Sequence, residues 1–371
     1  MKIYRIALGL AAICLGAALI TAVVGVATFT GPMLIAFFIM LAIGFRGVSQ
    51  LKGSSFTVII FAATTAAMYY PSYFVQWGGF KLVALITPLL QLIMFGMGTE
   101  IGLNDLAGVF KMPRAVFIGL LGHYTFMPLA GFTLALIFKF PPEIGAGVVL
   151  VGCMPCGMAS NVMSYLAKAN LALSVTLTAV STLLSPLLSP LLMKLLGGQF
   201  IQVKTGDMMW DIVRMVIIPL FAGLIFNRYF KGKVRWLDKT LSLVSMFGIA
   251  FIIVIIVASG RNSLLTIGPA LMLCAFLHNT SGYLFGYWMG RLLRLGERDA
   301  RTIAIEVGMQ NSGLASALAK AMGKAATLGL PAAIFGPIMN ISGSVLASYW
   351  HRHPPVVKEK TNTTANLSKA V

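Results

Sequence analysis

Apolar runs long enough to cross a lipid bilayer recur along the whole chain, and no other feature limits its fold so strongly. A helix needs about 20 mostly apolar residues to span the hydrocarbon core of a bilayer. Backbone polar groups inside that core must be bonded within the protein, which restricts spanning segments to helices or closed barrels. The sequence therefore predicts an all-α polytopic membrane protein with spans near residues 6–29, 32–45, 55–75, 82–99, 114–138, 142–167, 170–196, 210–227, 237–259, 264–290, 300–323 and 328–350.

The composition excludes the soluble classes of protein. Only 10% of the 371 residues are charged and 58% are hydrophobic, whereas an ordinary soluble domain carries roughly 25% charged residues. The chain lacks the charge needed to cover a soluble surface. A soluble enzyme, a nucleic-acid-binding protein and a largely disordered protein are excluded, and we expect the lipid bilayer to be the solvent.

The net charge of +18 comes from 28 Lys and Arg against 10 Asp and Glu, and it has a topological explanation. Lys and Arg accumulate in the cytoplasmic loops of membrane proteins. Twelve spans place both termini on one side, and a cytoplasmic N-terminus leaves 20 of the 28 basic residues inside. We predict a protein of the cytoplasmic (inner) membrane with both termini cytoplasmic and no nucleic-acid partner. The basic residues predicted to lie outside are Lys81, Lys139, Lys194, Lys204, Arg214, Arg261, Lys320 and Lys324.

Two of the apolar runs are interrupted by residues that break helices. The interruptions are 152–161 (GCMPCGMASN) and 306–313 (EVGMQNSG). Proline and closely spaced glycines disrupt the helical hydrogen-bond ladder. A broken helix in each half of a membrane protein indicates the binding site of a secondary transporter.

The positions of the interruptions predict an inverted repeat. Each lies in the fourth helix of a five-helix set, 55–196 or 210–350, and an odd number of helices reverses the membrane orientation. We expect two additional helices in front, of which 6–29 exceeds the roughly 7–15 residues of a signal-peptide core and 32–45 is a tilted or partial span. The predicted organisation is extra helices at 1–50, repeats at 51–200 and 201–351, and a disordered cytoplasmic tail at 352–371.

Glu306 is the only carboxylate deep inside an apolar run. A charged side chain near the bilayer centre costs about 2.5–3.5 kcal/mol on insertion scales, so it needs a partner. The closest basic residue of its own segment is Arg301, toward the cytoplasmic end. A bound cation would supply the missing partner, whereas a protonated glutamate between helices is the alternative.

Oxygen-bearing side chains surround Glu306 in the predicted arrangement. Hard cations prefer carboxylate, hydroxyl, amide and carbonyl oxygens, and residues four apart on a helix, such as Ser174 and Thr178, share one face. The N-termini of half-helices favour an anionic substrate. The candidate oxygen ligands are Ser160, Asn161, Ser174, Thr178, Gln310, Asn311 and Ser312.

Catalytic and nucleotide-binding motifs are absent from the sequence. There is no H-E-x-x-H, G-x-x-x-x-G-K-[ST] or G-x-G-x-x-G sequence, which argues against a metalloprotease, a P-loop ATPase and a dinucleotide-binding enzyme. We therefore expect no enzyme and no cofactor. The repeated spacing of Gly282, Gly286 and Gly290 predicts close helix packing. A channel and a membrane-embedded enzyme remain as weaker alternatives.

The motifs of the chain, in order from about residue 52 to 350, resemble those of the bile acid:sodium symporter family of secondary transporters. The 306–315 string EVGMQNSGLA is the most specific of them. The others are FGMG (95–98), MPRA (112–115), MPL (127–129), GCMP (152–155), ASNV (159–162), LSV (173–175), SPLL (185–188), HN (278–279) and NISG (340–343).

The resemblance implies a ten-helix unit divided into a panel domain and a core domain, in which the two broken helices cross. It implies sodium as the coupling ion and import of an organic anion, either a small carboxylate or a bile-acid-like molecule. It also implies two sodium sites and a substrate site. Sodium site 1 would use Ser160, Asn161, Ser174, Thr178 and Glu306; sodium site 2, His123, Glu306, Val307, Met309 and Gln310; and the substrate site, Asn161, Asn311, Met339 and Asn340.

The sequence departs from the family pattern at several positions. His123 stands where the second sodium site has a glutamine. Its imidazole is a poor sodium ligand that can titrate near neutral pH, which leaves proton-coupled transport of an organic anion as an alternative. Met339 replaces a histidine found in several bacterial relatives, and the first 50 residues have no counterpart in the family's ten-helix members. The sequence selects neither the anion nor an oligomeric state.

Overall fold

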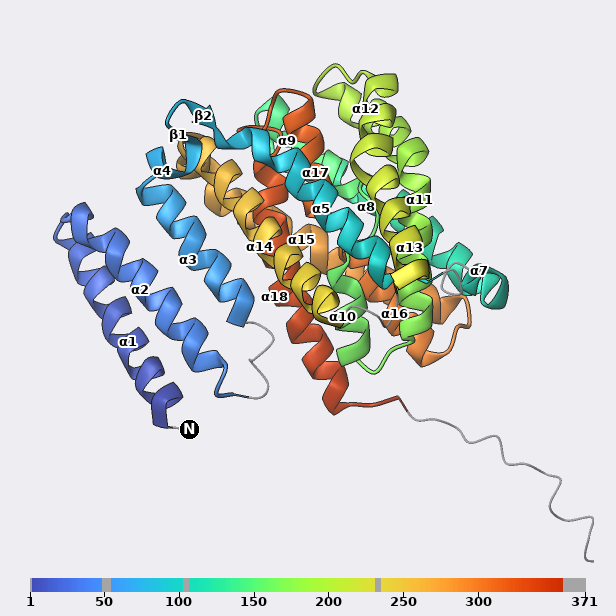
Figure 1. Ribbon diagram of the computed structural model, residues 1–371, viewed down its shortest axis with the longest axis horizontal. Coiled ribbons are helices and arrows are strands. Elements are labelled where there is room, and N and C mark those ends of the chain that lie inside the picture. Colours follow the sequence, from blue (N-terminus) through green and yellow to red (C-terminus); the bar gives the residue numbers. More distant parts are fainter. Residues whose placement is uncertain (1, 49–54, 103–106, 231–234, 356–371) are drawn as a thin grey trace, which may run out of the picture.

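The computed structural model of the chain (Figure 1) describes residues 2–48, 55–102, 107–230 and 235–355. Eight helical stretches in these ranges are long and apolar enough to cross a membrane. The prediction of an all-α polytopic membrane protein is therefore confirmed. The expected boundary at residues 50–51 and the tail beyond residue 355 lie outside the described residues.

The elements of the first half are all helical, apart from a β-hairpin whose two strands have two residues each. They are α1 (Lys2–Val23), α2 (Ala27–Phe45), α3 (Ser55–Tyr69), α4 (Ser72–Val75), β1 (Gln76–Trp77), β2 (Phe80–Lys81), η2 (Leu82–Leu85), α5 (Ile86–Glu100), α7 (Gly108–Lys111), α8 (Pro113–Phe138), α9 (Pro142–Gly152), α10 (Ala159–Leu166), α11 (Leu171–Leu195) and η3 (Gly197–Gln199).

The elements of the second half are all helices within the described residues, joined by short connections. Its elements are α12 (Thr205–Ile212), the π-helical turn η4 (Val213–Ile217), α13 (Ile218–Phe230), α14 (Arg235–Ser259), α15 (Arg261–Leu292), α16 (Glu297–Gly308), α17 (Ser312–Ala321) and α18 (Leu330–Arg352).

The two N-terminal helices form a hairpin at one edge of the molecule, where α2 packs against both α1 and α3 (Figure 1). The expected boundary between them at residues 30–31 is wrong. The turn lies at 24–26, where Gly25 adopts a φ of 79°, a conformation that glycine reaches without steric penalty. The expectation of a short second span is wrong too, because α2 continues through Pro32 and has 19 residues.

The remaining helices form two packed groups. Helix α5 packs against α13 and α14, and α14 also contacts α3. The second group contains α8, α9, α11, α15, α16 and α18, with α15 lying along α16. The division of the chain into inverted repeats at 51–200 and 201–351 stays a prediction.

The predicted close packing at the three glycines of α15 is present. A Cβ atom at Gly286 would lie 2.8 Å from the Ile303 carbonyl oxygen, and one at Gly282 would lie 2.8 Å from Cα of Gly308. Both contacts are closer than real side chains allow, so the absence of a side chain lets the backbones of α15 and α16 touch. This contact fixes the helix that carries Glu306.

Candidate functional site

The two broken helices meet at their interruptions. Helix α9 ends at Gly152 and α10 begins at Ala159, while α16 ends at Gly308 and α17 begins at Ser312. The unwound segments pair antiparallel through an isolated bridge between Cys156 and Gln310. The bridge bonds some of the backbone groups released by the breaks inside the protein, as the bilayer interior requires.

Two backbone hydrogen bonds hold this crossing together. The N–H of Gly157 donates to the Met309 carbonyl at 2.8 Å, and the N–H of Asn311 donates to the Pro155 carbonyl at 2.8 Å. A Cβ atom at Gly157 would lie 2.8 Å from the Gln310 carbonyl oxygen, so this crossing requires glycine there. The side chain of Asn311 caps α17 by accepting from the Leu314 N–H at 3.0 Å.

Glu306 lies beside this crossing with 1% of its surface exposed. The Ser174 hydroxyl donates to its Oε1, and the Thr178 hydroxyl donates to its Oε2 at 2.9 Å. Both donors come from α11, where their four-residue spacing places them on one face, as predicted. The carboxylate is therefore held by two hydroxyl groups from a helix remote in sequence.

Two further predicted residues complete this cluster. The Asn161 side-chain oxygen lies 2.9 Å from the Ser174 hydroxyl oxygen, and the Ser160 and Thr178 hydroxyl oxygens lie 3.3 Å apart. The structure thus brings together all five residues assigned to sodium site 1. We call these five, Ser160, Asn161, Ser174, Thr178 and Glu306, the Glu306 cluster.

The Glu306 cluster contains no basic partner within the described part of the chain. The salt bridges there join other carboxylates. Arg301, the nearest basic residue in sequence, pairs with Glu297 at 2.8 Å and donates to the Trp350 carbonyl. An ionised Glu306 would therefore need a cation from outside the protein.

Several groups assigned to sodium site 2 are already engaged in contacts within the protein. The ring nitrogens of His123 lie 3.1 Å from the Glu306 carbonyl oxygen and 2.7 Å from that of Met154. The Val307 carbonyl accepts a hydrogen bond from the Gln310 side-chain amide, and the Met309 carbonyl accepts one from the Gly157 N–H. The described surroundings leave the buried Oε1 of Gln310 without a hydrogen-bond partner.

A small cavity of about 70 Å³ adjoins the crossing. Asn311, Met339 and Asn340 line it, as predicted for the substrate site, but Asn161 does not and belongs to the Glu306 cluster instead. The first residues of α10 and α17 also line this cavity. Two helix N-termini, each with a partial positive charge, therefore face one space.

Several residues at the site could not be found from the sequence pattern. Leu90 and Ile249 bring α5 and α14 to the other wall of the cavity, and nothing separates them from ordinary apolar residues of a span. Asn279 donates to the Gly308 carbonyl at 2.6 Å and supports the second break. The only signal for Asn279 was its place in the His-Asn motif at 278–279.

Bilayer-length helices around two crossed, broken helices with a buried carboxylate define a secondary membrane transporter. Relatives of the chain are named as transporters as well, and not as enzymes. The sequence model of the Sodium Bile acid symporter family matches residues 87–267. The chain belongs to this family.

Similarity to individual relatives extends over most of the chain. An uncharacterized sodium-dependent transporter of Bacillus subtilis, YocS, is 40% identical over 325 residues, covering 87% of this chain and 98% of that protein. The probable sodium/metabolite cotransporter BASS1 of Arabidopsis thaliana is 36% identical over 266 residues, covering 72% and 66%. Its counterpart in Oryza sativa is 32% identical over 314 residues, covering 83% and 75%.

Proposed function

We propose that this protein is a sodium-coupled symporter that imports a small organic anion across the cytoplasmic (inner) membrane. The observation that carries this proposal is the Glu306 cluster: a buried carboxylate, two hydroxyl donors and no basic partner among the described residues. The names of two relatives, a sodium-dependent transporter and a probable sodium/metabolite cotransporter, support the choice of ion.

Sodium site 1 has the chemistry that a hard monovalent cation prefers. Its side chains are one carboxylate, one amide and three hydroxyls, and hard cations select oxygen ligands over nitrogen and sulfur. A sodium ion there would balance the charge of Glu306. The cluster joins α10, α11 and α16, so the ion would also tie the two broken helices to α11.

An anionic substrate fits the cavity beside the crossing. The N-termini of α10 and α17 face that cavity, and N–H groups at a helix start favour negative charge. The amides of Asn311 and Asn340 add neutral donors, while Met339 supplies an apolar wall. The substrate class supported by this lining is a small carboxylate with an apolar body.

Ion binding and substrate binding are coupled in this proposal because one short segment, from Glu306 to Asn311, contributes residues to both sites. Glu306 ends in the cation cluster, and Asn311, five residues later, lines the anion cavity and caps α17. A cation that fixes Glu306 would also fix the start of α17, so that each ligand favours the conformation that binds the other. Such a shared element gives reciprocal coupling of the two affinities.

We do not include a second sodium ion at site 2 in the proposal. The His123 ring contacts the Glu306 and Met154 carbonyl oxygens. The imidazole therefore lies where the resemblance implies a sodium ligand. Among the described residues, the Oε1 of Gln310 is an oxygen of that site without a hydrogen-bond partner. We therefore propose one sodium ion, at site 1, as the minimal coupling set.

The test of the proposed function begins with binding and then measures flux. Sodium chloride, but not potassium chloride, should raise the thermal stability of the purified full chain in detergent, because a bound ion stabilises the folded state. A carboxylate that stabilises the protein further in sodium should enter proteoliposomes faster under an inward sodium gradient. Equal stability in both salts would contradict the proposal, and a proton gradient that drives uptake without sodium would favour the proton-coupled alternative.

Membrane orientation is a separate part of the proposal. Figure 1 shows the N-terminus and the end of α18 at the same face of the molecule, which agrees with an even number of spans. We propose that this face is cytoplasmic. Reporters fused before Lys2 and after Arg352 should both give cytoplasmic signals in cells, and signals from opposite sides would contradict the predicted number of spans.

A further inference from the structure

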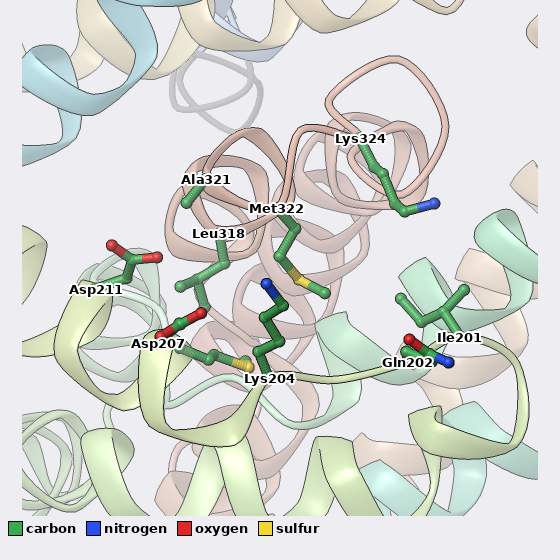
Figure 2. Close-up of a pocket in the computed structure, with 10 residues that line it drawn as sticks. Ile201, Gln202, Lys204, Asp207, Asp211, Leu318, Ala321, Met322 and Lys324 are labelled. Atoms are coloured by element: carbon green, nitrogen blue, oxygen red, sulfur yellow. The ribbon is translucent and has the colours of Figure 1, made fainter.

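A second cavity, of about 560 Å³, lies where α12 begins and α17 ends, at the end of the molecule opposite the start of α1 and the end of α18. Figure 2 shows its lining from three segments: the connection before α12, α12 itself, and α17 with the loop that follows. Leu318 and Met322 form part of an apolar wall, while Gln202, Lys204 and Asp207 add polar groups. The Lys and Arg count assigns this end to the outside of the membrane.

The charged residues of this outer cavity differ in their partners. Lys324 pairs with Glu143, and Asp211 pairs with Arg214 at 2.7 Å. Lys204 forms no ion pair with any residue that the structure describes, and its side chain extends into the space in Figure 2. Asp207 likewise has no ion pair among the described residues. The cavity therefore presents the ammonium group of Lys204 together with the carboxylate of Asp207.

The position of Lys204 is unfavourable for the helix that it precedes. It is the N-cap residue of α12 and makes no capping hydrogen bond with its side chain. A positive charge at a helix N-terminus opposes the helix dipole, whereas the carboxylate of Asp207 in the first turn complements it. Helix stability thus explains Asp207 and leaves Lys204 unexplained.

Helix α17 connects this outer cavity with the substrate cavity. Ser312 at its start lines the substrate cavity, and Leu318 and Met322 line the outer one. The rise of a helix separates Ser312 from Leu318 by roughly 9 Å. An anion in the outer cavity would therefore lie roughly 9 Å along α17 from the proposed binding site.

We propose that the outer cavity is a capture site for the transported anion, in which Lys204 attracts the carboxylate and Leu318 and Met322 contact its apolar part. This inference rests on the proposed function, which supplies the anion and the direction of transport. Asp207 lines the same cavity and disfavours a second negative charge. The ligand class is a monoanion with a small apolar body.

The electrostatic part of this inference can be tested without knowing the substrate. A thiol introduced by Met322→Cys, in a chain carrying Cys14→Ala, would react with membrane-impermeant methanethiosulfonates of either charge; the other native cysteines are buried. The anionic sulfonatoethyl reagent should be favoured over the cationic trimethylammonium reagent when both are added outside. Lys204→Gln should lower the ratio of the two rates roughly tenfold, because it removes one charge near the thiol.

Lys194→Gln is the matched control, because Lys194 is an exposed lysine in the last turn of α11 that does not line the cavity. It should leave the ratio unchanged. A ratio that is insensitive to Lys204→Gln would overturn the inference, as would reaction only from the inside.

The transport part uses the carboxylate identified by thermal stabilisation. Lys204→Gln should raise the KM for uptake from outside roughly tenfold, with kcat and sodium affinity unchanged, since capture precedes the sodium-coupled step. An unchanged KM would overturn the inference. Failure of the proposed function is distinguishable, because it would abolish sodium dependence in the unsubstituted protein while leaving the labelling ratio intact.

Discussion

The hydroxyl of Thr178 lies 2.9 Å from Oε2 of Glu306, although 128 residues separate them in the sequence. This contact joins α11 to the broken helix formed by α16 and α17. It turns an isolated buried acid into part of a polar cluster that spans three helices. In the proposed function, this cluster binds the coupling ion.

Glu306→Gln should abolish sodium-driven uptake while the protein still folds. The neutral amide keeps the size of the side chain but removes the charge that balances sodium, and a neutral group is easier to hold in the membrane. Unit charges 4 Å apart attract by about 4 kcal/mol at an effective dielectric near 20. Losing half of that attraction weakens sodium binding about 30-fold, which a sodium titration of uptake or of thermal stability would measure.

Asp211→Asn is the control for that substitution, because Asp211 pairs with Arg214 away from the crossing and such exposed pairs contribute little. It should leave the sodium affinity unchanged. Sodium affinity in Glu306→Gln equal to that of the unsubstituted chain would exclude site 1 as the coupling site.

Removing single hydroxyls from the Glu306 cluster should have smaller effects. Ser174→Ala and Thr178→Ala each delete one oxygen and one hydrogen bond to Glu306, so we expect sodium affinity to fall about 3- to 10-fold. Ser160→Ala should have an effect of similar size, since the Ser160 side chain interacts with Glu306 as well as with Thr178 and the Gly157 carbonyl.

Ser185→Ala, in α11 with Ser174 and Thr178, is the control for these hydroxyl substitutions. Its hydroxyl is buried and donates only to the Thr182 carbonyl. Sodium titrations of all four variants would rank them. If Ser185→Ala weakened sodium binding as much as Ser174→Ala, the effect would reflect general packing of α11 and not ion ligation.

His123→Gln should make the sodium dependence of uptake steeper. The amide oxygen of glutamine is a hard ligand next to the Glu306 carbonyl, where the imidazole now lies, so it would allow a second ion to bind. The Hill coefficient for sodium should rise from about 1 toward 2. Measurements at pH 6 and pH 8 also address the proton-coupled alternative, which predicts that the pH dependence of uptake disappears in the variant. An unchanged sodium response would leave His123 with a packing role.

Gly286→Ala should destabilise the protein by about 1–3 kcal/mol, because the added methyl group overpacks the contact between α15 and α16. Its Cβ atom would lie 2.8 Å from the Ile303 carbonyl oxygen. Gly9→Ala, within α1, is a suitable control because, apart from the chain neighbours of Gly9 and the nearby backbone of its own helix, no described atom lies within 4 Å of the added carbon. The midpoint of thermal unfolding in detergent should fall for the first variant and stay level or rise for the second. Equal midpoints would contradict the close packing of these helices.

The membrane class and the central carboxylate were predictable from the sequence. Bilayer-length apolar runs permit few folds, because lipid cannot bond to backbone groups. Glu306 stood out because it is the only carboxylate deep in such a run. The helix breaks were predictable where Pro155 and the nearby glycines interrupt the run.

Helix ends were harder to predict where several residues could form the turn. The segment from Val24 to Pro32 offers both Gly25 and Gly31-Pro32. Hydropathy does not distinguish these positions. The structure places the turn at Gly25 because α2 then extends far enough to pack along α1 and α3.

The tertiary structure alone decided how the polar residues divide between sites. Asn161 and Asn311 occupy equivalent-looking places in the two breaks, yet Asn161 joins the Glu306 cluster and Asn311 lines the cavity proposed for the substrate. The outer cavity around Lys204 likewise arises from α12 and α17, more than 100 residues apart in the chain. Local sequence determines where a helix must break and which residue cannot face lipid. Which side chains then meet depends on packing between distant helices, and neither hydropathy nor motif spacing encodes that packing.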